Sequence, residues 1–360
     1  MTATLTAERI EVRDFEDFQA LALSKTWQDG LPLVPPTEDR VAAMLTYCDR
    51  DPSFSFGTVA PYYGAATVEK LAIIAVMAGC APEYFPVLCA AVDAVVQPEF
   101  NLYGLQATTS PVTPLLIVSG PLADEIGING ADGAFGHGNV ANATIGRALR
   151  LVMIILGGGT VVPQVDRSTH GFPGKYSFCA AENVPATPWD PFPVQRGFDR
   201  STSTVSVFGV HGFHSMVDIV SDDAADLMLT LSAGVAATGT NNMTHGGEAL
   251  LVLCPEHAAI IGRSGWSVSD IQHFLFEHAR IDMTRLPEGF RTYLRSRRPK
   301  WVDQDRYPVV DRPEQHQVLV VGGTGIHSVY LPSFGSTVAV TRPVLDAAGD
   351  PVATLAALRS

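Results

Sequence analysis

The sequence contains little charge for its length and no long hydrophobic run. Charged residues make up 17% of the 360 residues and hydrophobic residues 46%, so the chain can form a large buried core. A membrane helix needs about eighteen consecutive apolar residues, and because no such run occurs we expect no membrane span. Residues 1–11 lack an apolar stretch behind a basic start, so we expect no secretory signal. The net charge of −13 argues against nucleic acids and anionic membrane surfaces as partners.

Cysteine is also scarce. The chain has five cysteines, an odd number without the close pair spacing of metal-binding motifs. This pattern predicts neither a disulfide framework nor a zinc site, and it fits a reducing compartment. We therefore expect a cytoplasmic protein. The sequence does not identify a cofactor.

The sequence shows no internal repeat or low-complexity tract and instead alternates helix-like and strand-like segments. The segments that favour helices are residues 14–28, 37–48, 67–78, 82–96, 143–156, 222–236, 255–264 and 267–280. The apolar runs that favour buried strands are residues 115–118, 204–210, 249–254 and 318–321. This alternation predicts an α/β fold with mixed or parallel sheets flanked by helices. A proline-rich stretch at residues 160–200 suggests two lobes, residues 1–200 and 201–360.

Glycine is concentrated at residues 127–138, where five glycines precede an apolar helix. We expect Asn142 to cap that helix and Arg147 to lie about one and a half turns into it. The free N–H groups and the positive dipole end of a helix N-terminus attract anions. The glycine spacing matches neither the dinucleotide fingerprint nor the P-loop. We predict that Gly136, Gly138, Asn142 and Arg147 bind a small anionic substrate, whose identity the sequence does not give.

A second glycine-rich turn, Gly322–Gly325, follows the strand expected at residues 318–321. Open α/β sheets bind ligands beyond the ends of their strands, so we predict that Gly323 and Gly325 also contact the ligand. The two glycine-rich loops would form two anion-accepting surfaces or two sides of one cleft.

Two cysteines have polar surroundings in the sequence. Cys80 lies in a short turn before a helix start, where the helix dipole lowers a thiol pKa. Cys179 follows Lys175 in a segment that, if extended, places both side chains on one face. We predict that Cys80 or Cys179 is the reactive thiol and alkylates fastest, with Lys175 and Glu182 in acid–base or orienting roles. The alternative interpretation is structural: a buried thiol in a helix corner and an edge strand with a surface lysine.

Several histidines lie beside glycines. His211 and His214 follow an expected strand, and Asp218 comes four residues after His214. These three side chains could bind a metal, although their spacing is not the His-Glu-x-x-His pattern. His214 and His327, which follows the Gly322–Gly325 turn, are also candidates for acid–base roles. A position in a surface turn would explain each of them without a function.

Four segments carry a resemblance to a known family. They are Asp29–Thr37, Ala75–Tyr84, Asn142–Leu151 and Gly174–Asn183. They resemble a poorly characterised bacterial family associated with small redox-type proteins named after a Sec/Cys-Gly-Ser-Cys (UGSC) motif, and the resemblance extends over most of the chain. It implies a cytosolic enzyme or enzyme subunit with thiol-dependent chemistry and a redox-type protein partner. The UGSC motif itself is absent here, which implies that the chain needs a partner or has diverged to other chemistry.

Three functional hypotheses follow. The first is a cytosolic enzyme that uses a reactive cysteine, as a redox group or a nucleophile, on a small anionic metabolite bound at the glycine-rich loop. The second is a metal-dependent lyase or hydrolase that uses His211, His214 and Asp218 with Glu182 or His245. The third is a non-catalytic subunit of a multi-component enzyme. We also expect the chain to form homo-oligomers.

Overall fold

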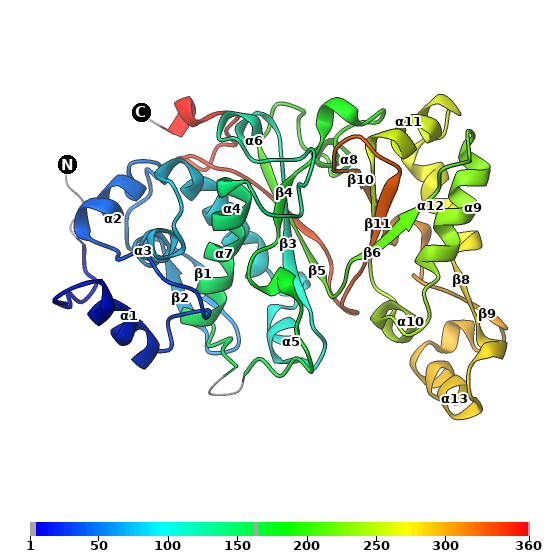
Figure 1. The fold of residues 1–360 in the computed structure, drawn as a ribbon, viewed down its shortest axis with the longest axis horizontal. Helices are drawn as coiled ribbons and strands as arrows, with labels where there is room; N and C mark the ends of the chain where they lie inside the picture. Colours follow the sequence, from blue (N-terminus) through cyan, green and yellow to red (C-terminus); the bar gives the residue numbers. More distant parts are fainter. Residues whose placement is uncertain (1–4, 162–164, 359–360) are drawn as a thin grey trace.

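Two four-stranded sheets face each other in the middle of the molecule, and helices cover the outer face of each sheet (Figure 1). The structure is a computed structural model, and it describes residues 5–161 and 165–358. The layers run helix, sheet, sheet, helix. This arrangement confirms the predicted α/β class with mixed sheets flanked by helices.

The two sheets have the same pattern of strand pairing. In spatial order, the first sheet contains β12 (Val340–Pro343), β5 (Thr204–Val210), β3 (Thr113–Ser119) and β4 (Cys179–Ala181). The second contains β10 (His316–Val320), β7 (Ala249–Leu253), β11 (His327–Pro332) and β6 (His214–Val217). In each sheet one edge pair is parallel, β3 with β4 and β7 with β10, and the other pairs are antiparallel. The fold therefore contains a structural repeat that the sequence does not show.

The two sheets exchange one strand each. The strand that comes next in the chain after β5 of the first sheet joins the second sheet, and the strand that comes next after β11 of the second sheet joins the first. β6 follows β5 in the chain but pairs with β11, and β12 follows β11 but pairs with β5. β5 also pairs with β3, which lies before residue 200, so strand pairing crosses the expected boundary. The two-lobe division is not confirmed, and the two expected domains stay a prediction.

Helices form the two outer layers. The N-terminal helices are α1 (Phe15–Ser24), α2 (Glu38–Leu45), α3 (Val68–Ala78), α4 (Phe85–Val95), α5 (Leu102–Ala107), α6 (Pro121–Glu125) and α7 (Val140–Ile155). The later helices are α8 (Phe192–Gln195), α9 (Ala224–Val235), α10 (Asn241–His245), α11 (Pro255–Arg263), α12 (Val268–His278) and α13 (Glu288–Arg297). α4 and α7 pack on the first sheet, while α9 and α12 pack on the second. None of the helices in the described part of the chain has the length and apolar character needed to span a membrane.

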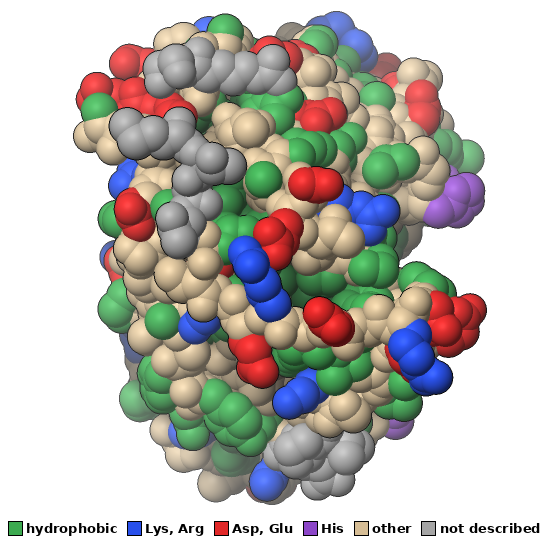
Figure 2. Space-filling view, turned by 90° about the vertical axis from the view of Figure 1, so that its left-hand side faces the viewer, with side chains coloured by type: hydrophobic (Ala, Val, Ile, Leu, Met, Phe, Trp, Pro, Cys, Tyr) green, Lys and Arg blue, Asp and Glu red, His purple; other side chains and the backbone are tan. Residues whose placement is uncertain are grey.

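Two small strand pairs lie outside the central sheets. β1 (Ser55–Val59) pairs with β2 (Gly64–Thr67) among the N-terminal helices, and β8 (Arg280–Asp282) pairs with β9 (Arg306–Pro308) near α13. On the face that carries the N-terminal helices, acidic, basic and hydrophobic side chains are interspersed (Figure 2). The net charge of −13 is therefore not gathered in one patch on that face.

Alternate residues of the central strands enter different hydrophobic cores. In β3, Leu116 and Val118 pack against the N-terminal helices, whereas Leu115 and Ile117 face the second sheet. Successive side chains of a strand point to opposite faces, so both sets must be apolar when both faces are covered. This explains why the central strands are continuous apolar runs in the sequence.

The helix behind the glycine-rich segment begins earlier than we expected. α7 starts at Val140, and Asn139 caps it by accepting a hydrogen bond from the backbone N–H of Asn142 (2.9 Å). Asn142 is buried inside the first turn, and its side chain bonds the backbone of Asn129 and the carbonyl of Ala134. Asn142 therefore holds the glycine-rich loop in place and does not cap the helix.

The shared layer between the sheets predicts one cooperative unfolding unit. Leu331 is fully buried in this layer, so Leu331→Ala should lower the free energy of unfolding by about 2–5 kcal/mol. The control Leu229→Ala changes a side chain that is 55% exposed on α9 and should alter stability by less than about 0.5 kcal/mol. Urea unfolding followed by circular dichroism measures both. Two separate transitions would contradict a shared core.

Candidate functional site

A cavity of about 820 Å³ lies between α7, the end of α1 and the loop that precedes β4. Its apolar lining comes from Leu23, Ile154, Val161, Phe172, Pro173 and Tyr176. Its charged and titratable lining comes from Asp29, Arg150, Asp166, His170 and Lys175. The volume lies in the range of small-molecule pockets, which combine apolar walls with a few polar groups.

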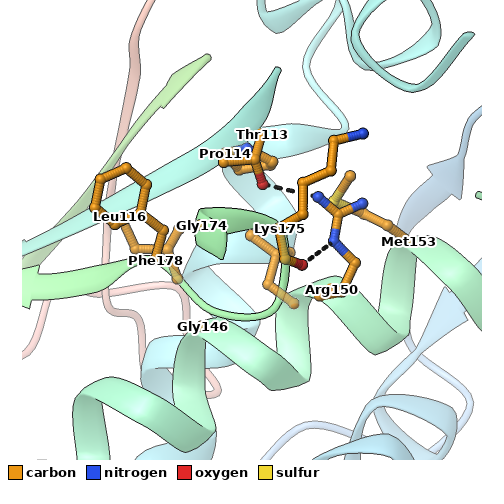
Figure 3. A pocket seen from close by; sticks show the side chains of 10 residues that line it. Thr113, Pro114, Leu116, Gly146, Arg150, Met153, Gly174, Lys175 and Phe178 are labelled. Carbon is orange, nitrogen blue, oxygen red and sulfur yellow. Dashed lines mark hydrogen bonds between the residues drawn. The ribbon is translucent and has the colours of Figure 1, made fainter. Parts of the chain in front are cut away.

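Arg150, on α7, is a buried charged residue that lines this cavity. It is 7% exposed, its Nε donates to the backbone carbonyl of Lys175 (2.7 Å), and its Nη2 donates to Thr113 Oγ1 (2.7 Å). Figure 3 shows the guanidinium between these two partners, beside a water-sized cavity of about 10 Å³. Throughout residues 5–161 and 165–358, no carboxylate forms a salt bridge with it. Burial lowers the pKa of Arg150 to about 10, although the charges of Asp166 and Asp29 oppose this effect from beyond salt-bridge distance. Its described hydrogen-bond partners, the Lys175 carbonyl and the Thr113 hydroxyl, are neutral.

Lys175 brings an amine to the same cavity. Its Nζ lies 2.5 Å from Asp166 Oδ2 and also donates to the Ser168 hydroxyl. Burial lowers the pKa of Lys175, the charge of Arg150 lowers it further, and Asp166 opposes both effects without cancelling them. Burial raises the pKa of Asp166, but the hydrogen bonds from Lys175 and Ser168 outweigh it, and the net pKa is lowered. A lysine that releases its proton more readily than usual is suited to proton transfer.

The segment from Lys175 to Cys179 is not extended throughout, so the condition for a shared face of the two side chains is not met. Lys175 ends a 3₁₀ turn (Pro173–Lys175), and β4 begins only at Cys179. The Cys179 side chain packs in the core beneath the N-terminal helices, while Lys175 extends to Asp166. Burial raises the pKa of the Cys179 thiol, and Lys175 does not oppose this effect.

Cys80 lies in the expected turn after α3, but its thiol is not activated there. Its Sγ donates to the carbonyl of Thr144 (3.3 Å). Burial raises the thiol pKa to about 12, because loss of hydration disfavours the thiolate more than nearby positive charge favours it. The predicted lowering of the Cys80 pKa is therefore wrong.

Arg147 holds a loop and is not available to a ligand. Its Nε and Nη2 pair with both carboxylate oxygens of Asp29 (2.8 and 2.9 Å), and Nη2 also donates to the carbonyls of Leu31 and Pro32. The Asp29 side chain is 3% exposed and the Arg147 side chain 14%. The predicted role of Arg147 as an anion ligand is replaced by a structural one, because its donors are already used.

The two glycine-rich loops contact each other. The N–H of Gly322 donates to the carbonyl of Gly130 (2.8 Å), and Gly323 packs so closely against Asp132 that a β-carbon would clash with its carboxylate. The N–H of Gly325 donates to Glu256 (2.6 Å). The structure thus brings the loops together, although neither loop lines the 820 Å³ cavity.

Gly136 and Gly138 lie at exposed positions of the first loop. Glu182 is buried at the end of β4, where it accepts hydrogen bonds from Ser119 Oγ (2.7 Å) and from the N–H of Phe192. Burial raises its pKa. This carboxyl joins three segments of chain and does not reach Lys175's cavity.

The structure does not assemble the expected histidine site. His214 is paired with Tyr330, and His327 is paired with Val217, so the two histidines lie at opposite ends of the β6–β11 pair. Both are exposed. They cannot act on one small substrate, because the strand separates them by about 10 Å.

The expected metal set is also spread along β6. His211 accepts a hydrogen bond from the N–H of Asn241 before the strand, and Asp218 accepts hydrogen bonds from the N–H groups of Val220 and Ser221 after it. Among residues 5–161 and 165–358, no group of three or more His, Cys, Asp or Glu side chains is arranged to hold a metal ion. His211, His214 and Asp218 are therefore not a metal centre in this fold.

Sequence reasoning missed Arg150 and Asp166 as site residues. Arg150 follows Arg147 by three positions, close to one helical turn, but its distinct role depends on Thr113, which lies 37 positions away. The proline-rich stretch around Asp166 was the available signal, since long irregular segments in compact domains often carry function.

Comparisons with family models, curated proteins and solved structures found no match for this chain. The resemblance to the UGSC-associated family therefore stays a prediction.

Breaking the Arg147–Asp29 pair should lower the stability of the fold while leaving the cavity in place. Arg147→Met leaves the buried carboxylate without its cation and should lower the free energy of unfolding by about 3 kcal/mol. The matched control is Arg200→Met, which breaks an exposed pair with Asp190 and should cost less than about 1 kcal/mol. Urea titrations compare the two variants, and equal stability losses would contradict this role.

The thiol environments predict an order of alkylation. Contact with the Cys89 thiol lowers the pKa of the partly exposed Cys48 to about 7, whereas burial raises the pKa values of Cys80 and Cys179. Because the thiolate is the nucleophile, iodoacetamide at neutral pH should label Cys48 before Cys80 and Cys179. Peptide mass spectrometry of quenched time points measures the order. Labelling of Cys80 or Cys179 first would restore the prediction made from the sequence.

Proposed function

We propose that the chain is an enzyme that acts on a small organic anion bound by Arg150 and Lys175. The observation that carries this proposal is the buried guanidinium of Arg150, which lines a large cavity and has only neutral direct partners. Asp166 and Asp29 act on this charge without forming a salt bridge with it, so an anionic ligand would supply the direct counter-charge that a buried cation favours.

The cavity walls support a ligand with an apolar part. Phe172, Ile154 and Pro173 line the cavity beside the two cations, and the exposed side chains of Leu23 and Tyr176 lie along it. Apolar surface that is open to solvent gains free energy when a ligand covers it. We therefore favour an aromatic or aliphatic carboxylate or phosphate over a small inorganic ion.

Lys175 is the group we assign to the chemistry. Its lowered pKa and its contact with Asp166 support a role in giving or taking a proton from the bound anion, as lyases and hydrolases require. No cysteine is among the described residues that line this cavity. Acid–base chemistry is therefore better supported here than the thiol chemistry that we expected from the sequence.

The cytoplasmic location, the homo-oligomer and the protein partner expected from the sequence have less support than the anion site. All five cysteines are free, which supports a cytoplasmic location. The homo-oligomer and the redox-type protein partner stay predictions. A non-catalytic subunit is the second candidate function, and it would bind the anion without converting it.

Anion binding is tested with phenylacetate as the probe and its neutral amide as the control ligand. Loss of one charge-assisted hydrogen bond should weaken phenylacetate binding by about 1.5–3 kcal/mol, or roughly 10–150-fold in Kd, in Arg150→Met and in Lys175→Met. Arg200→Met removes an exposed arginine and should bind as the wild type does. Isothermal titration calorimetry measures the affinities.

The pH dependence of phenylacetate binding should distinguish the contribution of Lys175 from that of Arg150. Lys175 is cationic below its pKa and neutral above it, so affinity should fall as pH rises through a value below that of an ordinary lysine. Lys175→Met should remove the part of this fall that occurs below about pH 9, where Arg150, with its pKa lowered to about 10, still keeps most of its charge. Equal affinity for phenylacetate and its amide in the wild type would sink the proposal.

A further inference from the structure

Cys254, which the sequence places inside an apolar run, lies beside a serine and a histidine at the end of a central strand. It directly follows β7, which β10 and β11 flank, and it precedes α11. Its backbone N–H donates to Ser328 Oγ (3.2 Å), and the same oxygen lies 3.7 Å from Cys254 Sγ. The serine hydroxyl therefore bridges the backbone and the thiol of one residue.

His257 continues this chain of contacts. It lies in the first turn of α11, and its Nδ1 is 2.7 Å from Ser328 Oγ. Its Nε2 is 3.0 Å from the backbone carbonyl of Asp218, which can only accept a hydrogen bond. The proton of a neutral His257 therefore sits on Nε2, and the lone pair of Nδ1 faces Ser328. This geometry lets Ser328 pass a proton from the Cys254 thiol to the imidazole.

The contacts favour a thiolate beside an imidazolium. Burial raises the pKa of Cys254, but its hydrogen bonds with His257 and Ser328 outweigh burial, and the net pKa is lowered. Burial lowers the pKa of His257, but Cys254 and Asp218 reverse the effect, and the net pKa is raised. Cys179 is as buried as Cys254, at 3% against 4% exposed, and burial raises its pKa. Desolvation acts less strongly on Cys254 than on Cys179, and Cys254 also contacts His257 and Ser328, so both effects separate the two thiols.

Access to this thiol is narrow. Cys254 is 4% exposed, His257 1% and Ser328 0%. The two residues before Ser328, Ile326 and His327, are exposed, so the thiol lies close beneath the surface. Such burial excludes bulky electrophiles, and the cost of desolvation disfavours charged ones.

We propose that Cys254, Ser328 and His257 form a second reactive site, in which hydrogen peroxide or a similarly small uncharged peroxide oxidises the Cys254 thiol. None of the three residues lines the cavity of Arg150 and Lys175, so this site is separate from the proposed anion site.

The step balances with peroxide as the only co-reactant. The thiolate sulfur attacks one peroxide oxygen, a sulfur–oxygen bond forms, and the oxygen–oxygen bond breaks. The departing hydroxide takes the proton held by His257 through Ser328. Sulfur loses two electrons to peroxide, and the products are the Cys254 sulfenic acid and water.

Peroxide treatment of the folded full chain, followed by removal of peroxide, unfolding in the presence of dimedone and peptide mass spectrometry, tests the proposal, because unfolding lets dimedone reach a buried sulfenic acid. A thiol whose pKa is one unit lower carries about ten times more thiolate at neutral pH, so Cys254 should oxidise at least about tenfold faster than Cys179. Their similar exposed fractions make Cys179 the internal control, and this comparison needs no variant. Oxidation of Cys179 at the same rate as Cys254, or no adduct at Cys254, would overturn the proposal.

Three variants test the roles of the neighbours. His257→Asn and Ser328→Ala should each slow oxidation of Cys254 and reduce the ultraviolet absorbance of its thiolate, with circular dichroism confirming the fold. His273→Asn, at an exposed position of α12, should change neither reading. Unchanged oxidation and thiolate absorbance in folded His257→Asn would overturn the relay. Cys254→Ser should leave phenylacetate binding intact, which separates this site from the proposed function.

Discussion

The apolar layer between the two sheets determines where polar and reactive side chains lie in this molecule. Leu115 and Ile117 from β3 meet residues such as Val252 and Leu331 from the second sheet, and helices cover the opposite faces. Strands that are apolar on both faces leave no place for reactive side chains along their length. Polar groups are therefore found where strands end, and Cys254 follows such an end directly. Buried there, these groups need partners from other segments.

Two arginines of α7 have different roles because they contact different partners. Arg147 and Arg150 both project from α7, and each makes several hydrogen bonds. Arg147 meets the carboxylate of Asp29, so its charge is compensated within the fold. Arg150 meets a hydroxyl and a carbonyl, which satisfy its donors but not its charge. Asp166 and Asp29 compensate this charge only from a distance, so a ligand in the cavity can supply the direct contact that Arg150 lacks.

The neighbours of a cysteine in the sequence do not determine the pKa of its thiol in this protein. Cys80 precedes a helical turn and Cys179 follows a lysine, yet burial raises both pKa values. Cys254 stands in an apolar run, yet its pKa is lowered by a histidine three positions on and a serine on another strand. Desolvation acts on every buried thiol, and only a base or donor in contact reverses it.

Local patterns in the sequence determined the α/β class, the main helices and the central strands, because apolar periodicity and buried runs are properties of short segments. α3, α4 and the strands β3, β5, β7 and β10 were predicted close to their observed bounds. The exchange of β6 and β12, the contact of Arg150 with Thr113 and the Cys254–Ser328–His257 chain were decided only by the tertiary structure. These features join residues that lie far apart in the sequence, for example 74 positions for Ser328 and Cys254 and 135 positions for Ser206 on β5 and Thr341 on β12. Side-chain charge and reactivity follow from what packing brings into contact, and packing of distant segments leaves no local pattern in the sequence.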